Sequence, residues 1–313
     1  MALRRLSGWL VALAAFLAAG AATAYETDQF NNRLAPLRDA GPAMDAHVNA
    51  AIADAVADYH GGRDELKLVN KVYFRLGGLH WVDHIEKWAM KSPEVEKLQT
   101  GRFKSIYRGH PWYATRVTAA FGIGATFKLD GVLVGSDKLG HFFSQGRKFW
   151  LRWTQSGDEQ QAAKRSAATE RGLFGQATTG DYSNADLVAN YEGHRFYRSL
   201  FEDDIVPGKP AIVRWDGERW IVQRAFAWSD HVNAYWDEAL LVNDFDGVLK
   251  PHMRERFLTF CPDYARDPGA WTVAPALDDE LMQRYAMLQL RDTRDMRLSS
   301  ICVQASTAAA APK

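Results

Sequence analysis

The chain has 313 residues, of which 47% are hydrophobic, and its 38 basic side chains balance 38 acidic ones. This composition excludes a disordered chain, because there is ample apolar material to bury. The balanced charge argues against nucleic acid as a partner, and only the N-terminal stretch is long and apolar enough to consider as a membrane span.

The N-terminus has the features of a secretory signal peptide. Arg4 and Arg5 form a short basic region, residues 6–20 are rich in Ala and Leu, and residues 22–24 form a small-x-small cleavage site. We therefore expect residues 1–24 to be a signal peptide and the product to be periplasmic, with an uncleaved N-terminal anchor as the alternative. No cysteine follows this site, so the segment is not a lipoprotein signal.

Export changes the interpretation of the two cysteines, Cys261 and Cys302. Disulfides form in oxidising compartments, and a bridge across about 40 residues would contribute roughly 4 kcal/mol in the chain-entropy model. We expect these two residues to form a disulfide. The alternative is a pair of free, buried thiols.

The spacing of apolar residues predicts a mainly α protein, with one compact multi-helix domain over residues 25–304 and a small β-hairpin. A disordered tail is expected over residues 305–313. Helices are predicted over residues 43–59, 79–90, 136–155, 156 to about 172–175, 183–201, 229–241 and 281–290.

Local signals refine this assignment. Ser136, Ser183 and Ser229 are expected as N-caps, and Ser156 with Glu159 forms a possible capping box. The glycine-rich residues 120–136 predict a loop with short extended pieces. An Asp-Gly pair at residues 216–217, between apolar runs, predicts the β-hairpin.

Two of the predicted helices carry polar residues at positions where packing favours apolar ones. On the helix after Ser183, Asp186 and Asn190 lie in the apolar stripe, and Glu192 lies on the opposite, charged face. Glu170 lies among alanines on the preceding helix. A buried carboxylate is costly without partners, so these positions need an explanation.

Asp137 and His141 are neighbours at i,i+4 on the helix after Ser136, nearly opposite its apolar face. Two interpretations have equal weight. The pair either belongs to a site or is a solvated pair at a helix N-terminus, where the helix dipole also favours Asp.

These residues together resemble the pattern of VanZ-like proteins. Asp137-Lys138-x-x-His141 matches D-K-x-x-H, Glu170 is the later Glu, and Asp186-x-x-x-Asn190-x-x-Gly193 matches D-x-x-x-N-x-x-G. The match covers residues 136–194. A family of small periplasmic lipoproteins carries a similar series, with an aromatic-Ser-x-x-Asp-Leu lead-in.

The whole chain is also similar to larger exported proteobacterial proteins of unassigned function, which share a Trp-Asp-Glu segment such as residues 236–238. There are departures from the VanZ-like pattern. VanZ-like proteins are membrane-embedded, they usually have Gln where this chain has Leu173, and the related lipoproteins carry a lipidation Cys that is absent here.

The resemblance implies a cell-envelope setting and a shared polar centre, without a settled reaction. The expected catalytic residues are Asp137, His141, Glu170 and Asp186, and the expected binding residues are Lys138, Asn190 and His194, with Lys138 at the rim. If the helices converge, crowded carboxylates would raise one pKa and place a general acid beside a general base.

Two functions follow from such a centre. One is a hydrolase or transferase acting on an envelope glycan or lipid-linked substrate. The other is a non-catalytic periplasmic binding or scaffolding protein in which the same cluster is structural. Whether the protein is an enzyme stays open at this point.

We expect no cofactor, although a divalent metal held by His141, Glu170 and Asp186 is an alternative to a metal-free site. His80 and His84 are spaced i,i+4 but lack an identified third ligand. A further polar cluster is expected, formed by Asp230, His231, Asp237 and Glu238.

Overall fold

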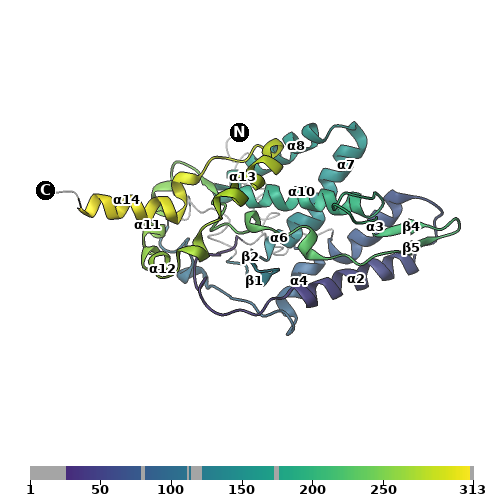
Figure 1. The fold of residues 1–313 in the computed structure, drawn as a ribbon, viewed down its shortest axis with the longest axis horizontal. Coiled ribbons are helices and arrows are strands. Elements are labelled where there is room, and N and C mark those ends of the chain that lie inside the picture. Colours follow the sequence, from purple (N-terminus) through teal and green to yellow (C-terminus); the bar gives the residue numbers. More distant parts are fainter. Residues whose placement is uncertain (1–25, 79–81, 111–112, 114–121, 173–175, 311–313) are drawn as a thin grey trace, which may run out of the picture.

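The computed structural model describes residues 26–78, 82–110, 113, 122–172 and 176–310 (Figure 1). The expected signal peptide lies outside these residues. Among the described helices, none has the length and apolar character needed to cross a membrane.

The protein is mainly α-helical with small two-stranded antiparallel sheets, which confirms the predicted fold class. Short 3-10 turns connect many of these elements. In chain order the helices and strands are α2 (Gly41–Ala57), α3 (Glu65–Leu76), α4 (His84–Lys91), β1 (Thr126–Leu129), β2 (Val132–Gly135), α6 (Asp137–Gly140), the π-helical turn η2 (His141–Gln145), α7 (Gly146–Ser156), α8 (Glu159–Arg171), α9 (Gln176–Thr179), β3 (Asp181–Tyr182), α10 (Asn184–Ser199), β4 (Val213–Trp215), β5 (Trp220–Val222), β6 (Asp244–Phe245), α11 (Leu249–Leu258), α12 (Cys261–Arg266), α13 (Pro275–Arg284) and α14 (Leu298–Ala310).

Helix α10 runs through the middle of the molecule and packs against α7, α8 and η2 (Figure 1). Ser183 caps it as predicted, since its hydroxyl accepts a hydrogen bond from the Asp186 N–H at 3.2 Å. Glu192 was predicted on the charged face, opposite the apolar stripe, but that face is not open to solvent. Glu192 is fully buried, because neighbouring segments cover α10 on that side as well.

The predicted 136–155 helix is present but is divided into α6, η2 and α7. Ser136 does not cap it, because its backbone is already helical and its side chain makes no cap bond. Gly157 ends α7 in the left-handed conformation, with φ of 68°. Ser156 therefore belongs to α7, and Asp158 rather than the predicted Ser156 caps α8 by accepting from Gln161.

The predicted helix over residues 229–241 is wrong. This segment forms 3-10 turns at Trp228–Asp230 and Ala234–Trp236. The Asn233 side chain accepts from the Tyr235 N–H, and Asp237 accepts from the Ala239 N–H. Such local side-chain bonds compete with the helical hydrogen-bond pattern.

Other boundaries also differ from prediction. Helix α4 begins at His84, and the predicted residues 79–81 lie outside the described residues. The late helix predicted over 281–290 is replaced by α13, which ends at Arg284, and by a 3-10 turn at Ala286–Leu288.

Two hairpins contain Asp-Gly turns. The predicted hairpin β4–β5 forms around Asp216-Gly217. Strands β1 and β2 form a second one, in which Asp130 and Gly131 both have positive φ. This is the backbone conformation that two-residue hairpin turns favour. Strands β1 and β2 are the short extended pieces predicted within residues 120–136, but their pairing as a hairpin was not predicted.

Among the residues that the structure describes, the buried apolar side chains form two clusters. The main core lies among α2, α3, α7, α8 and α10 and includes Met44, Phe142 and Trp228. The C-terminal core includes Phe30, Phe257 and other residues packed beneath α11 and α14.

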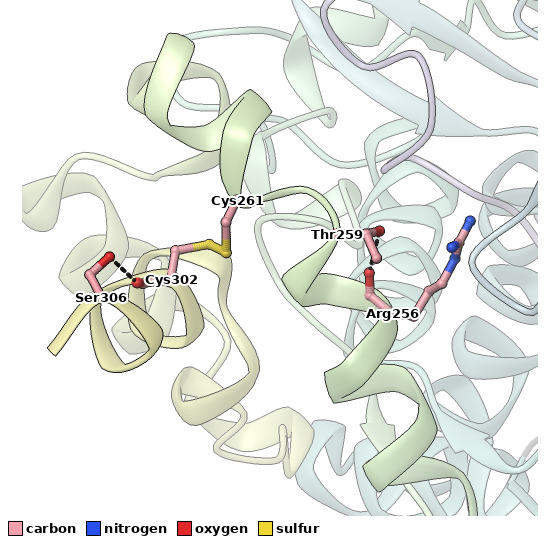
Figure 2. Close-up of a disulfide and its surroundings, with 5 residues drawn as sticks. All are labelled: Arg256, Thr259, Cys261, Cys302 and Ser306. Atoms are coloured by element: carbon pink, nitrogen blue, oxygen red, sulfur yellow. Dashed lines mark hydrogen bonds between the residues drawn. A yellow bond between two sulfur atoms is a disulfide. The ribbon is translucent and has the colours of Figure 1, made fainter. Parts of the chain in front are cut away.

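Cys261 and Cys302 form a disulfide in the C-terminal region. Figure 2 shows this bond between the start of α12 and the middle of α14. Helix α14 extends to Ala310, through part of the segment where the sequence predicts a disordered tail.

Candidate polar site

Lys138 forms the middle of a cluster of carboxylates. Its side chain is fully buried, and its Nζ lies 2.5 Å from Asp137 Oδ2, 2.7 Å from Asp186 Oδ1 and 2.7 Å from Glu238 Oε1. Burial alone would lower the pKa of Lys138, but the three negative charges raise it well above its ordinary value. Lys138 therefore lies inside the cluster, and the expectation that it lies at the rim of the pocket is wrong.

His141 begins the π-helical turn and lies at the accessible edge of this cluster, with 21% of its side chain exposed. Its Nε2 is 3.1 Å from Asp186 Oδ2, and its Nδ1 is 3.1 Å from Asn190 Oδ1. The Asn190 amide in turn donates to Ser166 Oγ at 3.2 Å. Asp137, Lys138, His141, Asp186 and Asn190 are therefore brought together from α6, η2 and α10, and π-helical turns are frequent at functional sites.

Glu170 reaches the same region from the end of α8. It is buried, and its Oε1 accepts a hydrogen bond from the Ser183 N–H at 3.1 Å. Burial raises the pKa of Glu170 well above its ordinary value, and the charge of Asp186 raises it further. Ser183 connects Glu170 to the cluster, since its N–H donates to Glu170 and its hydroxyl donates to Glu238 at 2.9 Å.

Some members of the cluster lacked a sequence signal. Thr27 donates to Asp137 Oδ1 at 3.1 Å across 110 positions of sequence, a pairing that no local pattern reveals. Glu238 has a partial signal, because it belongs to the Trp-Asp-Glu segment at residues 236–238.

Two more buried carboxyl groups, those of Asp181 and Glu26, lie near enough to Glu238 to feel its charge. Burial raises the pKa of Asp181 to about 6, against a hydrogen bond from Thr179 that lowers it. Tyr107 and Asn243 also donate to Asp181, at 3.3 and 3.2 Å. Burial, followed by the charge of Asp181, raises the pKa of Glu26 well above its ordinary value.

Two more acidic residues flank α6 from the start of α4. Ser144, within η2, lies 2.7 Å from Asp83, and burial raises the pKa of Asp83 to about 7. Glu86 accepts from the Asp83 N–H at 3.1 Å, and burial raises its pKa well above the ordinary value. Neither residue was predicted as part of the site.

His194, predicted as a binding residue, lies elsewhere on α10. It is fully buried, stacks on Phe149 and contacts Glu159 Oε1 through Nε2 at 3.0 Å. His84 contacts the Phe74 carbonyl, and His80 lies outside the described residues.

The polar cluster predicted from Asp230, His231, Asp237 and Glu238 does not form as one unit. Asp230 pairs with Lys209, His231 with Glu192, and Asp237 with Arg33. The four residues lie close in sequence, but the irregular backbone directs them to different networks.

Asp137, His141 and Asp186 can each offer one ligand atom, and these three atoms lie within 4.8 Å of one another. Within the described part of the chain, this set could hold a metal ion, whereas the metal alternative predicted from the sequence has Glu170 in place of Asp137.

Comparison with protein-family models, with curated proteins and with solved structures finds no match for the chain. The likeness to VanZ-like proteins therefore rests on the motif residues alone.

Proposed function

We propose that this protein is an exported cell-envelope hydrolase or transferase that acts through the Asp137, His141 and Asp186 centre. The observation that carries the proposal is the position of His141. It is partly exposed, it is oriented through Nδ1 by Asn190, and its Nε2 adjoins a carboxylate. An oriented histidine beside an acid is a common arrangement for moving protons during catalysis.

Glu170 supplies the complementary group. Its raised pKa favours the protonated form, whereas Asp137 and Asp186 lie against the ammonium group of Lys138. Acidic groups whose environments differ in this way can be divided between acid and base roles. Glu170 would donate a proton to the leaving group, and His141 with Asp186 would accept one from the attacking water or hydroxyl.

The envelope setting and the substrate class rest on the sequence. The N-terminal signal features support export, and the Cys261–Cys302 disulfide is compatible with an oxidising compartment. The resemblance to envelope proteins supports a glycan or lipid-linked substrate.

Turnover of purified peptidoglycan fragments and lipid-linked oligosaccharides tests the proposal. Glu170→Gln keeps an acceptor oxygen for the Ser183 N–H and should keep its melting temperature within about 4 °C, whereas Asp137→Asn also removes a carboxylate from buried Lys138 and should lower it. Turnover should fall by roughly 10²-fold or more. Glu96→Gln, at an exposed ion pair with Arg38, is the matched control and should leave turnover unchanged.

A second candidate is a non-catalytic binding or scaffolding protein of the periplasm. The fully buried Lys138 favours it, because one ammonium group joins carboxylates from α6, α10 and the Glu238 segment. Absence of turnover in the parent, or unfolding of both variants, would support this candidate against the enzyme.

A further inference from the structure

We propose that Asp137, His141 and Asp186 form a binding site for a divalent cation. This inference deepens the proposed function and rests on it for a role in catalysis: with the ion bound, His141 is a ligand, and the ion takes over from it the activation of the attacking water or hydroxyl. The three ligand atoms lie within 4.8 Å of one another. Ligands bonded to one cation at about 2.0–2.2 Å are separated by at most about twice that distance, so a small inward adjustment places an ion between these atoms.

The surroundings of His141 point independently to a cation. Its Nδ1 faces the amide oxygen of Asn190, and its Nε2 faces the carboxylate of Asp186, both at 3.1 Å. A neutral imidazole donates from only one nitrogen and meets the other acceptor with its lone pair, a conflict that either a second ring proton or a metal ion removes. A metal ion at Nε2 removes that conflict, while Nδ1–H continues to donate to Asn190.

Asn190 has the arrangement expected of a residue that orients a metal ligand. Its Nδ2 donates to Ser166 Oγ at 3.2 Å, which leaves Oδ1 directed at the histidine. Histidine ligands commonly donate their second ring N–H to such an oxygen, which fixes the ring and its tautomer.

The two carboxylates are also held in place before any ion binds. Lys138 contacts Asp137 through Oδ2 and Asp186 through Oδ1, while Thr27 contacts the other Asp137 oxygen. The single charge of Lys138 stands against three carboxylates, including Glu238. A divalent ion would balance the remaining two negative charges.

The site is partly exposed to solvent. The exposed fractions of the His141, Asp137 and Asp186 side chains are 21%, 14% and 12%. Three protein ligands with an open position are typical of catalytic metal sites, where the ion activates water. One imidazole with two carboxylates suits Zn²⁺ or Mn²⁺.

Isothermal titration of the EDTA-treated, tag-free mature chain with ZnCl₂ and with MnCl₂ tests this inference. At least one of the two ions should bind at one site per chain. His141→Ala should weaken binding by at least about 100-fold, and Asn190→Ala by about 10- to 100-fold because it removes only the orienting contact. His84→Ala is the matched control, since His84 lies on α4 and contacts the Phe74 carbonyl instead, and it should bind as the parent does.

Thermal unfolding in EDTA shows which variants are folded, and His141→Gln replaces His141→Ala if the latter does not fold. The inference is overturned if neither ion binds the parent, or if a folded His141 variant binds as tightly as the parent. Stoichiometric binding without turnover would support the metal site and contradict the proposed enzyme. Turnover in EDTA, together with no binding of either ion, would support the proposed enzyme and contradict the metal site.

Discussion

Lys138 shows how one buried charge can determine the geometry of its neighbours. Its ammonium group has no exposed surface and fixes one oxygen of Asp137, of Asp186 and of Glu238. A charge in this position is tolerated only because it is paired, and its removal leaves the partner carboxylates without compensation.

We predict that Lys138→Met lowers the free energy of unfolding by about 3–5 kcal/mol, the usual cost of breaking a buried ion pair. Lys67→Met removes an exposed lysine paired with Asp64 and should cost less than about 1 kcal/mol. Urea denaturation of the two variants measures the difference. Equal stabilities would show that the buried pairing contributes little.

Asp83 makes the free energy of unfolding of the protein depend on pH. Its pKa is raised from 3.8 to about 7 by burial, despite the bond with Ser144. Between these values the unfolded chain has lost the proton and the folded chain keeps it, so the contribution of Asp83 to stability falls as the pH rises. Above about pH 7 both states are ionised and the contribution is constant.

Asp83→Asn should remove this dependence, because Asn does not ionise but still offers Ser144 an acceptor. The free energy of unfolding of the parent minus that of the variant should fall between pH 4 and pH 7 and then level off. Urea unfolding at several pH values across this range measures it. A difference that rises with pH, or does not change, would contradict the assignment.

At the scale of elements, the site depends on the close approach of α10 to η2 and α7. A Cβ added to Gly193 would lie 1.9 Å from the Phe142 carbonyl oxygen and 3.0 Å from Gly146 Cα. Both contacts involve backbone, so no side-chain movement can relieve them. Glycine at these positions therefore allows Asp186 and Asn190 on α10 to reach His141.

Gly193→Ala should consequently lower the free energy of unfolding by about 3 kcal/mol, at the upper end of typical overpacking costs. Gly101→Ala provides the control, since nothing lies within 4 Å of its added Cβ and its φ is −67°. Thermal denaturation compares the two. A Gly193→Ala transition as high as that of the control would mean that the helices separate without cost.

The sequence predicted those elements whose signals lie within a few neighbouring residues, and it failed where distant contacts decide the structure. Ser183 and its helix were predicted because the cap and the first turn are adjacent in sequence. The 229–241 segment was mispredicted because local and tertiary contacts outweighed its helical pattern.

The same holds for the site. Asp137 and His141 were identifiable from their i,i+4 spacing within the D-K-x-x-H motif, and Asp186 from its position in the apolar stripe of its helix. Thr27 and the role of Glu238 were not, because contacts over 110 and 100 positions depend on the complete tertiary fold.

On the scale of the whole molecule, the disulfide links α14 to α12 beside the C-terminal core. The two cysteines are 41 positions apart, so a Cys261→Ser/Cys302→Ser variant should lose up to about 4 kcal/mol of stability in the chain-entropy model. Because the model places this effect in the unfolded chain, amides that exchange through global unfolding, such as those of α10 in the main core, should also exchange faster. Faster exchange in α14 with unchanged exchange in α10 would show that the bridge stabilises only the C-terminal region.

The central claim is that His141 belongs to a functional centre and is not a support of the fold. The most direct measurement is the free energy of unfolding of His141→Ala in EDTA, because it requires no knowledge of the substrate. If this partly exposed histidine serves function, its replacement should change the free energy of unfolding by less than about 1 kcal/mol. A loss of more than about 2 kcal/mol, the cost of leaving Asp186 and Asn190 without their partner in a structural network, would contradict the claim.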